Sequence, residues 1–153
     1  MITEPSCTRT LEVIREELRT TVMPACTDPA AQVALGMIDT MLLGVIARCD
    51  HEVAWMREEI AEIETAAAAV LAAGADTGGH VAEALADLRA HRSQTDHTAD
   101  VRAEYHRAGE LLSRCLEAAM TAGGDLSEEV RAVLEARLAR EMQIRGDFSL
   151  VGR

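Results

Sequence analysis

Lysine is absent from this chain, and its other scarcities exclude several classes of protein. All 15 basic residues are arginine, which excludes both a Schiff-base lysine and the lysine of a phosphate-binding P-loop. Aromatic residues make up only 2% of the 153 residues, whereas sheet-rich proteins use many aromatic and β-branched side chains. Alanine, leucine, glutamate and arginine are frequent instead, and these residues favour helix. We therefore predict an all-α fold.

Positive charge is also scarce relative to negative charge. The formal net charge is −11, and such a surface repels phosphate groups, so we expect no nucleic-acid and no membrane partner. The longest uninterrupted apolar runs, Met41–Ala47 and Ala66–Ala73, are much shorter than the roughly 20 residues that cross a bilayer. The first residues resemble no secretion signal. We expect a cytoplasmic protein.

Motifs for metal binding and catalysis are lacking as well. No histidine follows a glutamate by three residues, as it does in metal-binding bundles, and the four cysteines show no C-x-x-C spacing. His97, Asp100 and Glu104 could share one helical face, either as metal ligands or as a solvated charged surface. There is no G-x-S-x-G sequence and no glycine-rich phosphate loop. We predict no catalytic residue, metal or cofactor, and enzymatic activity stays an open question.

Apolar residues that recur every three or four positions predict a succession of helices in a single domain spanning residues 1–153. Short connections between them favour an antiparallel bundle of four to five helices around one long central helix. Residues 1–7 and 146–153 are expected to be flexible ends. The predicted helices cover residues 8–22, 29–70, 79–92, 98–122 and 125–145.

Local signals mark the ends of these helices. Ser6 or Thr8 is the expected cap of the first helix and Pro24 its end, and Asp28 caps the second helix with Pro29 at its first position. Glycines follow the helices that end near residues 70 and 122.

Three of the helices have a single apolar stripe. The stripes consist of Leu11, Ile14, Leu18 and Val22 in the first helix, of Val101, Tyr105, Ala108, Leu112, Cys115 and Ala119 in the fourth, and of Val130, Leu134, Leu138 and Met142 in the fifth.

The predicted long helix is apolar on two faces, which indicates that it lies between partners. Gly44 is a place where it could kink. The first face is a continuous seam formed by Leu42, Ile46, Cys49, Val53, Met56, Ile60, Ile63, Ala67 and Val70. The second face is a stripe formed by Met37, Met41, Gly44, Arg48, His51 and Trp55.

Asp39 lies seven residues before Ile46, so it continues the line of the seam towards the start of the helix with a carboxylate. A covered carboxylate needs a partner or a raised pKa. Asp39 is therefore either a ligand contact or general base in a pocket, or a structural residue. In the structural case it forms an ion pair with an arginine of another helix, or the first turns of its own helix are exposed.

The second stripe also allows two interpretations. Arg48, His51 and Trp55 follow Met37 and Met41 in a composition typical of protein interfaces. A glycine at position 44 would let another backbone approach closely. The alternative is that Trp55 covers a helix of its own chain while Arg48 and His51 lie at the edge of the bundle.

The first third of the chain carries a weak family resemblance. Leu11 to Leu18, then Val22-Met23-Pro24-Ala25 and Asp28-Pro29-Ala30, resemble small helical bacterial proteins of unassigned function. Those proteins occur with aminoglycoside-phosphotransferase-like kinases and acyl-CoA dehydrogenase-like enzymes. The resemblance implies a partner or accessory role near acyl-thioester or phosphotransfer metabolism, and carries no catalytic residue over to this chain.

Two functional hypotheses follow. The first is a helical interaction or accessory protein that forms a homodimer through the long helix, with Met37, Met41 and Gly44 in the interface. The second is a small-molecule binding protein or enzyme with a polar pocket around Asp39, for which the resemblance suggests acyl-CoA or a related metabolite. The candidate binding residues are Asp39, Arg48, His51 and Trp55.

Overall fold

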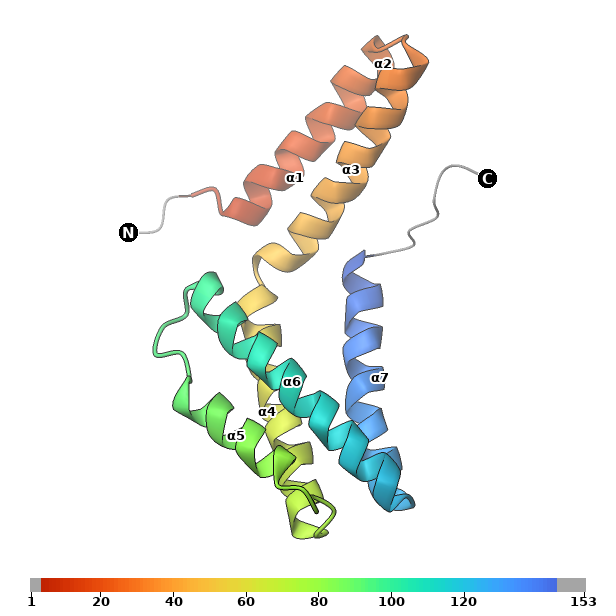
Figure 1. Ribbon diagram of the computed structural model, residues 1–153. Coiled ribbons are helices and arrows are strands. Elements are labelled where there is room, and N and C mark those ends of the chain that lie inside the picture. The colour runs from red at the N-terminus through yellow and green to blue at the C-terminus, as the bar shows by residue number, and fades with distance from the viewer. Residues whose placement is uncertain (1–3, 146–153) are drawn as a thin grey trace. The chain divides into compact units, whose positions relative to one another are not determined.

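The computed structural model describes residues 4–145, and within this range every regular element is a helix, which confirms the all-α prediction. Figure 1 shows these elements in order. They are α1 (Cys7–Glu17), the π-helical segment η1 (Leu18–Val22), α2 (Met23–Ala25), α3 (Pro29–Cys49), α4 (Glu52–Ala72), α5 (His80–Ala90), α6 (Thr98–Ala122) and α7 (Asp125–Arg145). The predicted flexible segment 146–153 lies outside the described residues.

Contacts along the chain define two compact units. The first comprises residues 1–51 and 142–153, and the second comprises residues 52–141. The expectations of a single domain and of one antiparallel bundle stay predictions.

The first unit contains a helical hairpin, in which α1, η1 and α2 run one way and α3 returns beside them (Figure 1). Ser6 caps α1 because its Oγ accepts a hydrogen bond from the Arg9 N–H at 3.2 Å. Asp28 caps α3 in the same way, accepting from the Ala31 N–H at 2.8 Å, and Pro29 occupies the first helical position. These starts agree with the sequence, which placed a cap at Ser6 or Thr8 and a second cap at Asp28.

Pro24 does not simply end the first helix. It has no N–H to donate, and its ring crowds the carbonyl of Thr20. The chain widens into η1 just before the proline, so that the Met23 N–H bonds to the carbonyl of Leu18, five residues back. The helix then continues through the short α2 to Ala25.

The predicted long helix is two helices. It breaks at Asp50 and His51, not at Gly44, and the His51 N–H bonds to the carbonyl of Arg48 at 2.9 Å in the turn. Aspartate and histidine are weak helix formers, but neither indicates the end of a helix as strongly as glycine or proline does. The continuous seam was therefore wrong across residues 49–53, while its later part is correct.

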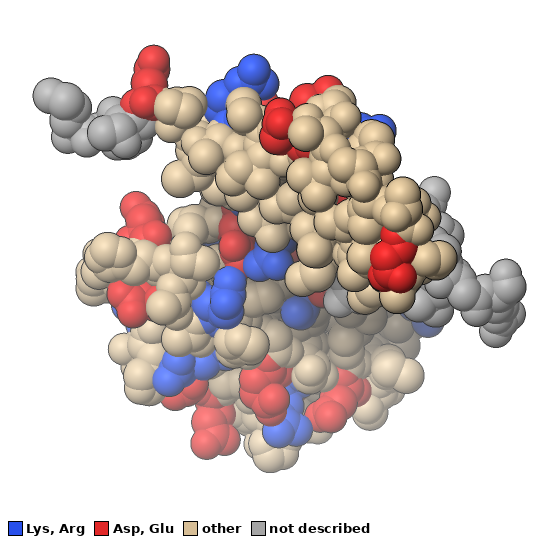
Figure 2. All heavy atoms as spheres, turned by 90° about the horizontal axis from the view of Figure 1, so that it is seen from above, with Lys and Arg blue, Asp and Glu red and all other residues tan. Residues whose placement is uncertain are grey.

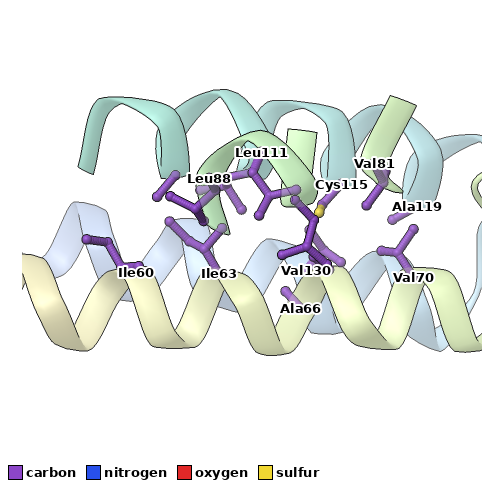
Figure 3. Packing of buried hydrophobic residues seen from close by; sticks show 14 residues of the cluster. Ile60, Ile63, Ala66, Val70, Val81, Leu88, Leu111, Cys115, Ala119 and Val130 are labelled. Atoms are coloured by element: carbon purple, nitrogen blue, oxygen red, sulfur yellow. The ribbon is translucent and has the colours of Figure 1, made fainter. Parts of the chain in front are cut away.

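The second unit has the buried core. Residues of α4, α5 and α6 interdigitate around Ile63, Leu88 and Leu111, and Val130 of α7 is fully buried among them (Figure 3). The seam from Met56 to Val70 lies in this core, as predicted. The stripe predicted for α6 is also buried except for Tyr105, which is half-buried.

Two predicted apolar stripes are not core. In α1, Ile14 and Val22 are exposed, although Leu11 and Leu18 in the same stripe are half-covered. In α7, Val130 is buried but the rest of its predicted row is exposed, namely Leu134, Leu138 and Met142. The side of α7 that faces the core carries arginines instead, for the electrostatic reason given below.

Candidate functional site

Asp39 is paired with an arginine of its own hairpin. Arg15 Nε of α1 lies 2.8 Å from Asp39 Oδ1 of α3, and Arg15 Nη2 donates a hydrogen bond to Oδ2 at 3.1 Å. Both side chains are about four-fifths covered. The pair therefore matches the ion-pair alternative for Asp39, because an arginine occupies both carboxylate oxygens.

A groove of about 580 Å³ runs along one side of the same hairpin. Asp39 does not line it, so the groove is not the polar pocket that the sequence suggested around this residue. Its walls combine charged and apolar side chains, which are Arg9, Glu12, Val13, Arg15, Glu16, Glu17, Leu43 and Ile46.

The apolar residues of the second stripe are open to solvent within their unit. Met37 is 63% exposed and Met41 is 67% exposed. Gly44 is half-covered, and a Cβ at this position would lie 3.8 Å from the carbonyl oxygen of Ile144 in the same unit. The backbone that comes near Gly44 here is therefore the chain's own.

Arg48, His51 and Trp55 do not continue this stripe along one helix. Arg48 lies in the last turn of α3, and His51 lies in the turn after the helix, with both side chains exposed. Trp55 lies in α4, in the second unit, where it is half-buried and its carbonyl accepts a hydrogen bond from Arg140 Nη1 at 3.5 Å. The break at Asp50 thus divides these candidate binding residues between two units.

The second unit contains a buried polar cluster that the sequence analysis missed. Glu59 of α4 is buried, and its Oε2 accepts a hydrogen bond from the Tyr105 hydroxyl of α6 at 2.5 Å. Arg140 Nη1 of α7 donates to Glu59 Oε1 at 3.1 Å, and Arg137 Nε lies 3.9 Å from Oε2. The Arg137 guanidinium also lies over the Tyr105 ring, 5.0 Å from its centroid. A buried carboxylate needs these partners, which is why α7 turns its arginines inward.

Glu104 of α6 forms a second buried cluster and is only 1% exposed. Its Oε2 accepts hydrogen bonds from Arg57 Nη1 at 2.7 Å and from the Ser93 N–H at 3.1 Å. Arg57 Nη2 also donates to the carbonyl of Thr95 at 2.9 Å. The cluster therefore fastens the loop before α6 to α4. Glu104 is not part of a solvated face with His97 and Asp100.

Both buried carboxylates are paired with arginine. Glu59 accepts hydrogen bonds from Arg140 and the Tyr105 hydroxyl, and Glu104 accepts them from Arg57 and the Ser93 N–H. Among the described residues, no group of three or more histidine, cysteine, aspartate or glutamate side chains could hold a metal ion. Burial raises the pKa of the Cys115 thiol to about 11, which keeps it neutral at physiological pH.

The signal for these buried glutamates was present in the sequence. Glu59 lies three residues after Met56 and four before Ile63, and Glu104 has the same spacing between Val101 and Ala108. A carboxylate at a seam position is the feature that also drew attention to Asp39. No equally local signal identifies the arginines that pair with them.

Comparison with known proteins adds no relative: no family model, curated protein or solved structure matches the chain.

The Tyr105 hydroxyl provides a test of the Glu59 cluster. Burial, followed by the hydrogen bond to Glu59 and its negative charge, raises the pKa of Tyr105 from 10.0 to about 12. The folded protein therefore keeps this proton where the unfolded chain loses it. The resulting stabilisation is complete below pH 10 and is lost as the pH rises towards about 12. Tyr105 is the only tyrosine, so ultraviolet titration of the phenolate reports it alone.

We expect Glu59→Gln to lower this pKa, because it removes the negative charge beside the phenol. The urea-unfolded chain, which titrates near the ordinary value, is the control. A native midpoint as low as that of the unfolded chain would show that Tyr105 is not held against Glu59.

The Arg15–Asp39 pair is tested by a double-substitution cycle with Arg15→Leu and Asp39→Leu. Each single substitution should destabilise the protein, because it leaves a charge that is about four-fifths covered without its partner. The double substitution should cost less than the sum of the two, with a coupling free energy of about 0.5–3 kcal/mol in urea unfolding. Additive effects would mean that Asp39 does not depend on Arg15 and would reopen its role as a ligand contact.

Proposed function

We propose that this protein is a helical interaction module that self-associates through the exposed apolar face of α3. The observation that carries the proposal is the absence of a core in the hairpin. None of the described residues from 4 to 51 is buried, although α3 is one of the most apolar segments of the chain. Short helices in water depend on packing of their apolar faces for most of their stability. Another surface is needed to cover α3.

The composition of α3 suits such a contact. Its 21 residues include only two charged side chains, Asp39 and Arg48, and Arg15 neutralises the first. Large exposed apolar side chains follow one another at helical spacing on the face turned away from α1, at Val33, Met37, Met41 and Val45. Exposed apolar patches of this kind mark interaction sites. In Figure 2, seen from above, most atoms near the viewer are uncharged.

A membrane is the other environment that could cover this face. By length and composition alone α3 could cross a bilayer, with a mean hydropathy of 1.7 in its best window. The sequence analysis considered only uninterrupted apolar runs, and it missed the length of this apolar helix because Asp39 divides the run. However, α1 packs along α3, so a bilayer that surrounded α3 would also surround the charged side chains of α1. These are Arg9, Glu12, Arg15, Glu16 and Glu17. Placing these charges in hydrocarbon would be costly, which favours a protein partner.

The small-molecule hypothesis receives less support. Its central residue, Asp39, is occupied by Arg15, and the groove on the hairpin does not include it. An accessory role beside an enzyme of acyl-thioester or phosphotransfer metabolism stays compatible with a self-associating module.

Substitution of Met41 by glutamate tests the proposal. The wild-type protein should be a dimer at micromolar concentration, measured by size-exclusion chromatography with light scattering. Met41→Glu should weaken the dimer by about tenfold or more, because it places a charge in an apolar contact. Met120→Glu is the matched control, since Met120 is 72% exposed on α6 of the second unit.

A wild-type protein that is monomeric at these concentrations would contradict self-association. A dimer that is lost in Leu138→Glu but kept in Met41→Glu would move the contact to α7 and would contradict the role of α3.

A further inference from the structure

The last turn of α7 reaches the exposed apolar face of α3. A Cβ at Gly44 would lie 3.8 Å from the carbonyl oxygen of Ile144, which is an ordinary van der Waals contact, and both residues belong to the first unit. Gly44 lies on the same side of α3 as Met37 and Met41, because it follows them by seven and by three residues. Both methionines are exposed, so the backbone of α7 ends at an apolar surface that it covers only in part.

The sequence that continues from this contact is apolar, and its side chains carry no net charge. Residues 146–153 lie outside the described residues and begin two positions after Ile144. Three of them are large apolar residues, namely Phe148, Leu150 and Val151. One aspartate and one arginine are the charged side chains, and their formal charges cancel. Such a segment can cover an apolar surface without adding net charge to it.

The segment is also long enough to cover this face. Eight residues of extended chain span up to about 26 Å, at about 3.3 Å per residue. Val33 is the farthest of the large exposed residues on this side of α3 and lies 11 residues before Gly44. That separation is about 17 Å along a helix that rises about 1.5 Å per residue. Val33 and the two methionines are therefore within reach of a chain that leaves α7 beside Gly44.

We infer that residues 146–153 dock on the exposed apolar face of α3 and compete there with a second copy of the chain. The contact is autoinhibitory, because it lowers the fraction of chains in which α3 is free to self-associate. This regulatory part rests on the proposed self-association. The docking of the segment does not, since it follows from the position of Ile144 and from the composition of the segment.

Tethering favours this segment over an occupant from solution. A group joined to its site by a short chain has an effective concentration in the millimolar range, about a thousand times that of a partner at micromolar concentration. A second copy must also approach against the repulsion between two chains that each have a net charge of −11. Residues 146–153 meet no such barrier, so they cover the face in the monomer and give way to a second copy as the protein concentration rises.

Methionine oxidation tests the docking independently of self-association. The protein is kept at a concentration at which light scattering finds a monomer, and oxidation by hydrogen peroxide is followed by peptide mass spectrometry. Phe148→Asp should speed the oxidation of Met41 by about threefold or more, because a charge in the segment weakens an apolar contact and uncovers the sulfur. Ser149→Asp is the matched control, since it adds the same charge at a polar position, and it should leave the rate within about twofold. Met120, which is 72% exposed on α6, should be oxidised at the same rate in all three proteins.

The same variants test the competition by sedimentation equilibrium. Phe148→Asp should lower the dimer dissociation constant by about threefold or more, whereas Ser149→Asp should leave it within about twofold. A dissociation constant that rises in Phe148→Asp would place the segment inside the dimer contact and overturn the inference.

The remaining outcomes separate the docking from the proposed function. If Met41 is oxidised at the same rate in the wild-type protein and in Phe148→Asp, the segment does not dock on α3, and the inference fails while the proposed function is untouched. The inference also fails if Ser149→Asp acts as strongly as Phe148→Asp, because charge alone then explains the effect. If the oxidation of Met41 responds as expected but no dimer forms at micromolar concentration, the docking is confirmed and the proposed function fails.

Discussion

Helix α3 has more apolar surface than α1 can cover, and the organisation of the first unit depends on this imbalance. The covered side of α3 meets α1 along Leu42 and Ile46, with the Arg15–Asp39 pair beside them. That pair stands where an apolar contact would otherwise be. A buried or half-buried ion pair contributes little net stability, but a displaced register would leave both charges unpaired. The pair therefore favours one alignment of α1 on α3, and this alignment determines which residues are left outside.

In the second unit, the apolar faces of the helices are covered by other helices of the same unit. Its core covers the apolar faces of α4, α5 and α6, and its two buried glutamates are each matched by arginines. Because Glu59 draws Arg137 and Arg140 inward, α7 exposes Leu134 and Leu138. The orientation of α7 thus follows from neutralising a buried charge and not from covering the largest apolar area.

Sequence patterns predicted the helices well where the boundary carried a strong local signal. Ser6, Asp28, Pro29 and the glycines after α4 and α6 identified ends that the structure confirms. The break at Asp50 was missed because no glycine or proline marks it. The prediction of which face of α7 points inward was also wrong. Periodicity counts the apolar residues of one helix and cannot show that α7 faces the buried carboxylate of Glu59 on α4. Asp39 was recognised as unusual, but its partner Arg15 lies 24 residues away and only the folded hairpin brings them together.

Amide hydrogen exchange at two protein concentrations tests most directly whether a second copy completes the hairpin. At high concentration the amides in the middle of α3, around residues 36–46, should exchange slowly, and dilution below the dimer dissociation constant should make them exchange fast. Amides of Ile60 to Val70 in the core of α4 should be slow at both concentrations. Exchange in α3 that does not change with dilution would contradict the account, because the hairpin would then be stable without a second copy.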